Sequence, residues 1–191
     1  ILYPSGGSVS VMGEEPWKRN REFLKKIAFV MGNKSDMNWD LPAVDTFAYQ
    51  KLLYDIPEQE YRESLKRLTE MLRLDTILLN TQVRRLSLGE RMKVELVNSF
   101  LYSPRLIFLD EPTIGLDIGS QDAIREFIRE YWQKKGASIL LTSHDMDDIE
   151  NTCDRILVLK KGKLAYALDV EELKKKSGSF RETMKGLLEG E

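Results

Sequence analysis

The chain has 191 residues, of which 42% are hydrophobic and 31% are charged, and its 29 basic residues nearly balance 31 acidic ones. This composition is typical of one globular domain with a hydrophobic core, without the clustered excess of Lys and Arg that marks nucleic-acid-binding proteins. A single cysteine excludes an internal disulfide, and no run reaches the roughly 18 apolar residues of a membrane-spanning helix. The chain opens with ILYPSGG, without an initiator Met or a signal peptide, so we expect a fragment of a longer protein.

The first forty residues predict two strands. After a turn at residues 4–7, alternation places Val9 and Val11 on one face of a short strand. The compact apolar run IAFVM at residues 27–31 predicts the second strand. Pro42, in the segment WDLP, disfavours helix at the preceding residue, so an element boundary is expected there.

Between residues 43 and 101 the pattern is helical. Four side chains recur at i, i+4, i+7 and i+11 and therefore share one face of a helix: Tyr61, Leu65, Leu68 and Leu72. We interpret this stripe as core packing rather than as a ligand site, because apolar residues at this spacing usually face a core.

The next part of the chain predicts a strand, a helix and a second strand. The run LIFL at 106–109 suits a strand buried on both faces, as in a parallel sheet, and SILLTS at 138–143 suits the strand that follows. Between them, five residues at helical spacing predict a helix that ends at Gly136: Ile124, Phe127, Ile128, Tyr131 and Trp132.

Polar residues stand where each of these strands ends. Asp110 and Glu111 follow the first strand and His144 follows the second. Parallel strands joined by one helix end at the same edge of a sheet, so the three side chains should converge on one rim. In phosphate chemistry the first carboxylate of such a pair holds Mg²⁺ and the second activates water, while a histidine can hydrogen-bond a γ-phosphate. Alternatively, these residues have only structural roles. One of the acids would then cap a turn or pair with an Arg, and His144 would be an ordinary surface or core residue.

The C-terminal part predicts smaller elements. A short helix at 145–152 and an apolar strand at 156–159 lead into a KKGK turn and the segment LAYA. The last twenty-odd residues are charged and helical, and we interpret the lysines at 174–176 as a solvated face.

The segment RRLSLGE contains a helix start. Ser87 and Glu90 fit the S-x-x-E pattern of a capping box. Capping alone would explain these residues. A serine hydroxyl, the amide of Gly89 and a helix N-terminus also form an anion site, and the two interpretations are compatible.

The segments LSLGE (86–90), LIFLDEP (106–112) and GLD (115–117), followed by His144, resemble a known set of motifs. They are similar to the signature, the Walker B strand, the D-loop and the switch histidine of the ATP-binding subunit of an ABC transporter. With WDLP upstream, the sequences of these motifs are most similar to those of exporter-type bacterial members, whose ATPase subunit is separate from the membrane subunits.

This resemblance implies the α/β fold of a P-loop NTPase, with a RecA-like parallel sheet core and an inserted α-helical subdomain, truncated at the N-terminus. The chain would be a single ABC ATP-binding domain. Residues 1–38 and 102–168 would form the α/β core, residues 39–101 the helical subdomain, and residues 169–191 a C-terminal helical tail.

The resemblance also implies ATP and Mg²⁺ as cofactors. Asp110 would assist Mg²⁺, Glu111 would activate the attacking water, and His144 would contact the γ-phosphate. Asn33 stands where the family has its Q-loop glutamine and would touch Mg²⁺.

The implied partners are a second ATP-binding subunit, in a homodimer or heterodimer, and transmembrane permease subunits. Ser87 and Gly89 would meet ATP bound to the opposite subunit, and Asp117 would communicate across the dimer. The helical insert from 41 to about 101 would dock the permease, which places the protein peripherally on the cytoplasmic face of the plasma membrane.

The sequence departs from the family pattern in several places. Asn33 is one methylene shorter than glutamine, and Leu88 and Glu90 replace a glycine and a glutamine of the signature. No GxxxxGK[ST] phosphate loop occurs, and GGS at 6–8 has no following Lys. We therefore expect an ATPase in the intact form and an inactive fragment.

Two other interpretations stay open. The chain could be a catalytically inert, truncated subunit that binds another ATPase or the membrane subunits. Chromosome-maintenance ATPases and ABC-family translation factors share the motifs, but the first would carry long coiled-coil heptads and the second usually two cassettes in tandem.

Overall fold

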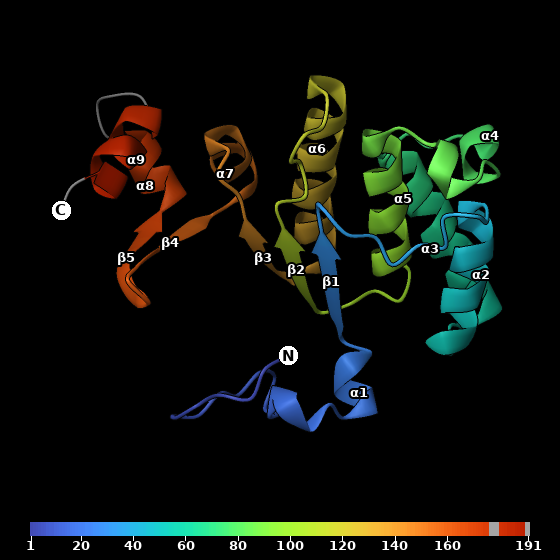
Figure 1. Cartoon of the computed structure of the whole chain (residues 1–191), viewed down its shortest axis with the longest axis horizontal. Helices are drawn as coiled ribbons and strands as arrows, with labels where there is room; N and C mark the ends of the chain where they lie inside the picture. The colour runs from blue at the N-terminus through green and yellow to red at the C-terminus, as the bar shows by residue number, and fades with distance from the viewer. Residues whose placement is uncertain (176–179, 190–191) are drawn as a thin grey trace.

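A computed structural model describes residues 1–175 and 180–189 (Figure 1). Its centre is a parallel sheet in the order β1 (Ile27–Met31), β2 (Leu106–Asp110) and β3 (Ser138–Thr142). Helix α6 (Ile118–Lys135) joins β2 to β3, and Gly136 ends it in the left-handed conformation with φ 61°. The predicted strand at 27–31 and the predicted strand–helix–strand unit are confirmed, and all three strands end at one edge of the sheet.

Helices α5 (Leu88–Phe100) and α6 cover one face of this sheet with the main hydrophobic core. At their contact, the ring of Phe100 lies 5.0 Å from that of Phe127 and 4.6 Å from that of Tyr131, both in edge-on geometry. All three side chains are fully buried, so this aromatic cluster fixes how the two helices pack.

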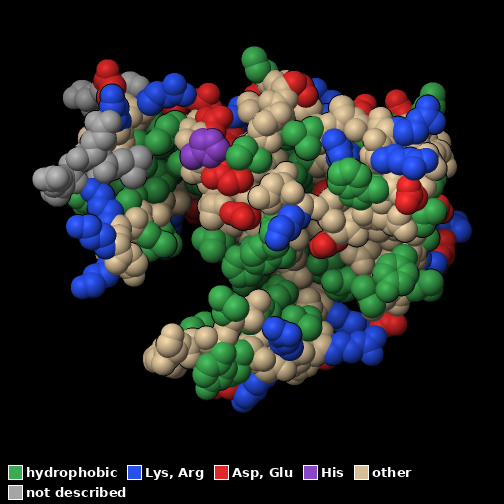
Figure 2. Space-filling model, viewed as in Figure 1, with side chains coloured by type: hydrophobic (Ala, Val, Ile, Leu, Met, Phe, Trp, Pro, Cys, Tyr) green, Lys and Arg blue, Asp and Glu red, His purple; other side chains and the backbone are tan. Residues whose placement is uncertain are grey.

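The other face of the sheet is open. In β2, Ile107 and Leu109 are buried, whereas Phe108 between them is only partly buried. Its partners in register, Phe29 and Leu140, are 52% and 49% exposed. Figure 2 shows hydrophobic side chains lining a hollow between the N-terminal segment and the C-terminal elements. The prediction that this strand is buried on both faces is therefore wrong for the described residues, because none of their elements covers this face.

The predicted helical stretch is divided into several helices beside α5. They are α2 (Ala43–Leu53), α3 (Glu58–Met71), α4 (Thr76–Leu79) and the 3-10 turn η2 (Val83–Arg85). Pro57 precedes α3, and the Asp75 side chain caps α4 by accepting from the Leu78 amide at 2.8 Å. The predicted apolar stripe is confirmed as core packing, with Leu68 and Leu72 fully buried and Tyr61 and Leu65 packed against the core.

The C-terminal part forms a second, smaller core. Helix α7 (Met146–Thr152) leads to an antiparallel hairpin of β4 (Arg155–Lys160) and β5 (Lys163–Asp169), followed by α8 (Val170–Lys175) and α9 (Phe180–Glu189). Val170 and Leu173 pack with buried residues of β4. Of the predicted lysine face, Lys174 and Lys175 are exposed, and residue 176 lies outside the described residues.

The predicted strand around Val9 is wrong. The described residues before β1 contain only η1 (Pro16–Lys18), α1 (Arg21–Leu24) and one isolated bridge between Val11 and Glu14. Val9 is 45% exposed, and none of the strands in the described part of the chain lies beside it to complete a ladder. Across the described ranges, no helix is both long enough and apolar enough to cross a membrane.

Candidate functional site

The structure brings the predicted rim residues together. β2 and β3 are in register at Asp110 and Thr142, and the Thr142 hydroxyl donates to Asp110 Oδ1 at 2.5 Å. His144 Nδ1 lies 2.8 Å from Glu111 Oε2, so the residues after the two strands form a direct pair. Figure 2 shows the histidine on the surface above a cluster of acidic side chains.

Glu111 is held in an unusual backbone conformation. Its φ is 52°, in the left-handed region that a non-glycine residue seldom adopts. Its amide donates to the Thr142 carbonyl at 3.0 Å, and its carbonyl accepts from the Ile114 amide at 3.2 Å. Such strain costs on the order of 1–3 kcal/mol and persists mainly where function requires a fixed geometry. The backbone therefore aims the Glu111 carboxylate at His144.

Gly32, in the turn after β1, makes this conformation possible. Its amide donates to the Asp110 carbonyl at 2.8 Å. A Cβ at this position would lie 2.0 Å from the Glu111 carbonyl oxygen and 2.8 Å from Ile114 Cγ2. Asn33 follows in the same turn with an exposed side chain, so it stands at the sheet edge, and its contact with Mg²⁺ stays a prediction.

Replacing Gly32 by alanine is expected to lower the free energy of unfolding by about 1–3 kcal/mol, the usual effect of overpacking a tight contact. The new methyl group would have to displace the backbone of Glu111. Urea unfolding followed by circular dichroism measures the change. Gly6→Ala is the matched control, because a Cβ at Gly6 meets nothing within 4 Å. Equal unfolding midpoints for the two variants would contradict the role of Gly32.

The hydrogen bond that His144 donates to Glu111 raises the pKa of His144 above its ordinary value of 6.5, and the charges of Glu111, Asp145 and Asp148 add to the effect. The Glu111 carboxylate can only accept, so Nδ1 donates to it, and the His144 side chain is 72% exposed. With Nδ1 used in this way, Nε2 can donate to a phosphate oxygen only when the ring is protonated. The raised pKa favours this protonated form.

We expect proton NMR of the chain's only histidine to give a pKa above 6.5, and we expect Glu111→Gln to move it back toward 6.5. The folded state holds the proton more tightly than the unfolded state. The pair therefore adds to stability below pH 6.5, and this contribution is lost as the pH rises through the raised pKa. Identical titration curves for both proteins would show that the pair does not form in solution.

A second group of predicted residues lies where α5 and α6 begin. Ser87 caps α5 by accepting from the Glu90 amide at 3.3 Å, while Glu90 accepts from the Ser87 amide at 2.8 Å, so the predicted capping box is confirmed. Asp117 caps α6 through the amide and hydroxyl of Ser120, at 3.0 and 2.7 Å, and these bonds lower the pKa of Asp117.

Gly89 connects these two helix starts. It is buried, and a Cβ there would lie 2.1 Å from the Ser120 hydroxyl and 3.3 Å from Asp117 Oδ2. Ser87 and Leu88 are exposed beside it. The structure thus brings the predicted signature against the predicted D-loop. Among the described residues, no hydrogen bond joins Ser87, Gly89 or Asp117 directly to Glu111 or His144.

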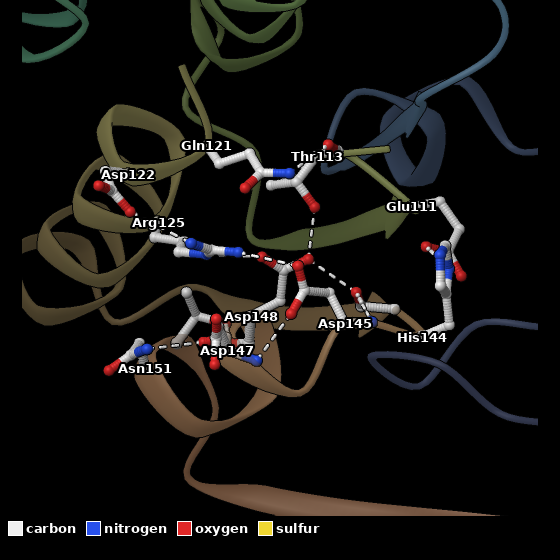
Figure 3. A network of polar contacts seen from close by, with 12 residues as sticks. Glu111, Thr113, Gln121, Asp122, Arg125, His144, Asp145, Asp147, Asp148 and Asn151 are labelled. Carbon is white, nitrogen blue, oxygen red and sulfur yellow. Dashed lines mark hydrogen bonds and ion pairs between the residues drawn. The ribbon is translucent and has the colours of Figure 1, made fainter. Parts of the chain in front are cut away.

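Two buried acids of this region were not predicted. Asp148 is 1% exposed and accepts from Arg125, Thr113 and Ser143 (Figure 3). Its only sequence signal is a place in the acidic segment HDMDD, which does not tell which acid points inward.

Glu95 of α5 is the second buried acid that was not predicted, and it is 3% exposed. It accepts from the Ser35 hydroxyl at 2.5 Å and from the Asp36 amide at 3.2 Å, and burial raises the pKa of its carboxyl. It therefore ties the turn after β1 to α5. A charged residue at a core position of a helix was its only sequence signal.

Known proteins are similar to this chain in sequence. A family model described as "ABC transporter" matches residues 1–114. The ABC transporter ATP-binding protein NatA of Bacillus subtilis is 28% identical over 91% of this chain and 70% of its own length. The energy-coupling factor transporter ATP-binding protein EcfA3 of Oenococcus oeni is 26% identical over 87% of this chain. The chain spans only 58% of the length of EcfA3.

The fold has close counterparts among solved structures. One, an ATP-binding subunit of an ABC transporter, superposes with a TM-score of 0.83 over 98% of this chain and 79% of its own, at 24% identity. The α/β fold predicted from the motifs is therefore confirmed, with its parallel sheet and flanking helices.

Proposed function

The chain belongs to the ABC transporter family as an ATP-binding domain, and from that premise we propose that its full-length form hydrolyses ATP to power export of a substrate. One observation carries the proposal. The Glu111 carboxylate, in a strained backbone, is paired at 2.8 Å with His144 at the edge of the sheet where α/β proteins bind ligands.

In this proposal Glu111 accepts a proton from the water that attacks the γ-phosphate. A positioned general base of this kind contributes about 10²–10⁴-fold in rate. His144 holds the Glu111 carboxylate through Nδ1 and, when protonated, donates through Nε2 to a γ-phosphate oxygen. The same contact therefore orients the base and leaves a donor for the substrate.

Asp110 suits Mg²⁺. Its carboxylate is exposed at the same rim, and Mg²⁺ prefers oxygen ligands, usually one or two carboxylates together with water and substrate phosphates. Among residues 1–175 and 180–189 no three His, Cys, Asp or Glu side chains are grouped to hold a metal by themselves. The Asp110 site therefore suits a Mg²⁺ ion that arrives bound to the nucleotide. Such an ion would neutralise phosphate charge, and Asn33 would supply a second oxygen ligand.

The sequence of this chain contains no GxxxxGK[ST] phosphate loop. We propose that the full-length protein supplies it and that the fragment alone is inactive. ATPase activity is therefore expected only from the full-length protein that contains this chain.

We further propose that the protein works as a head-to-tail dimer. Ser87 and Gly89 would face ATP on the opposite subunit, and Asp117 would carry the signal between the two sites. The exposure of Ser87 and Leu88 beside the start of α5 supports this, as does the contact of Gly89 with the residues that cap α6.

The remaining assignments follow from the family. Residues 39–101 would be the helical subdomain that docks the transmembrane permease, residues 1–38 and 102–168 the α/β core, and 169–191 a C-terminal tail. The protein would lie on the cytoplasmic face of the plasma membrane. The proposal of export, rather than import, rests on the similarity of the motif sequences to those of exporter-type members.

The test is phosphate release from ATP by the purified full-length protein, with and without Mg²⁺. We expect saturable release that requires Mg²⁺. Release no faster than in a protein-free blank, from a protein that still co-purifies with its membrane subunits, would favour an inert binding subunit instead.

A further inference from the structure

We propose that Asp148 is a positioning residue that holds the Glu111 loop and the His144 loop at one fixed separation; this role rests on the proposed function. Asp148 lies on α7 and touches neither member of the pair in the contacts that Figure 3 draws. It binds instead Thr113, two residues after Glu111, and Ser143, directly before His144.

The hydrogen bonds divide between the two oxygens of Asp148. Oδ2 accepts from the hydroxyl of Thr113 and, at 2.7 Å, from the hydroxyl of Ser143. Oδ1 accepts from Arg125 Nε at 2.7 Å. One carboxylate oxygen therefore joins the chain after β2 to the chain after β3. The two loops cannot separate without breaking a hydrogen bond to a charged group.

Burial makes this junction, formed by Asp148 with Thr113, Ser143 and Arg125, rigid. Asp148 is 1% exposed, Thr113 is 3% exposed, and the Arg125 side chain is 11% exposed. A buried carboxylate that loses its partners is strongly unfavourable, so the three donors keep their places together. Arg125 is itself held by Asp122 at 3.1 Å and by Asp145 at 3.2 Å, which anchors the junction to α6.

The neighbouring acid shows that the arrangement is specific to Asp148. Asp147 stands on the same helix, but its side chain is 54% exposed and its ion pair is to Arg181 at 3.4 Å. It contacts neither of the two loops through its carboxylate. Asp147→Asn therefore removes one negative charge from α7 without loosening the junction.

The test is an NMR titration of the chain itself, in which His144 is the only histidine and its pKa reports the contact with Glu111. Thr113→Val and Ser143→Ala each remove one hydroxyl donor without changing charge. We expect both to lower the pKa of His144 toward 6.5, and the double variant to lower it further. Thr113→Ser and Ser143→Thr keep a hydroxyl and should retain the wild-type pKa, as should Asp147→Asn.

Neutral variants are needed because the charge of Asp148 itself contributes to the pKa of His144. They are also the safer choice for folding, since Asp148→Ala would leave Arg125 unpaired. If folded Thr113→Val, Ser143→Ala and their double variant all titrate like the wild type, the proposal is wrong.

A second readout separates this proposal from the proposed function. In the full-length protein, the double variant should lose kcat with little change in KM, because the proposed role of the junction is to position the base Glu111, which acts only when water attacks. The titration needs no ATP. A full-length protein without ATPase activity would thus overturn the proposed function, while the predicted shifts in the His144 pKa would still support the role of Asp148.

Discussion

Glu111→Gln in the full-length protein is expected to slow ATP hydrolysis by about 10²–10⁴-fold, the contribution of a positioned general base. The amide has nearly the shape of the carboxylate but cannot accept a proton from water. ATP binding should survive, because the proposed role of Glu111 begins only when water attacks. Steady-state phosphate release at saturating ATP and Mg²⁺ measures the loss.

The control for this variant is Glu126→Gln. It makes the same chemical change on the surface of α6, where Glu126 is exposed and pairs with Arg73 at 2.9 Å. Exposed pairs contribute little, so this variant should hydrolyse ATP at the wild-type rate. Equal rates for Glu111→Gln and Glu126→Gln would mean that Glu111 is not the base.

Phe100→Ala is expected to lower the free energy of unfolding by about 3–5 kcal/mol, the range for deleting a buried aromatic ring. Phe100 is fully buried and contacts two rings of α6, so its loss leaves a cavity between α5 and α6. Urea unfolding of the chain measures the effect.

The matched control is Tyr49→Ala, which removes an aromatic side chain that is 62% exposed on α2. Exposed substitutions usually change stability by less than about 0.5 kcal/mol. If both variants unfold at the same urea concentration, the aromatic cluster is not the centre of the core.

Local patterns in the sequence predicted the elements whose signals are themselves local. The apolar run of β2, the left-handed Gly136 and the Ser87–Glu90 capping box each depend on residues within one or two turns of chain. The strand around Val9 was wrong because alternation says nothing of whether a partner strand lies beside it. Burial of β2 on both faces likewise depended on a covering layer that the sequence pattern does not specify.

The same distinction applies to the site. Asp110, Glu111 and His144 could be placed together from the sequence, because each follows a strand and parallel strands end at one edge. Asp148 could not be distinguished from Asp145 and Asp147, since only the packing of α7 decides which acid is buried.

The role of Gly32, which leaves room for the Glu111 backbone, also could not be predicted from sequence patterns. Its close approach to the Glu111 carbonyl joins residues about eighty positions apart, and no local signal reports such a contact. The chemical groups of the site are thus visible in the sequence, whereas the residues that hold them in place are visible only in the tertiary structure.

We expect Glu111 and His144 to act as one unit in hydrolysis, and a double-mutant cycle in the full-length protein measures their coupling. Steady-state kcat would be measured for the wild type, Glu111→Gln, His144→Ala and the double variant. Groups that act together are strongly non-additive, so the double variant should lose no more activity than the worse single variant. Losses that multiply in the double variant would show that the two residues act independently, contrary to their 2.8 Å pairing.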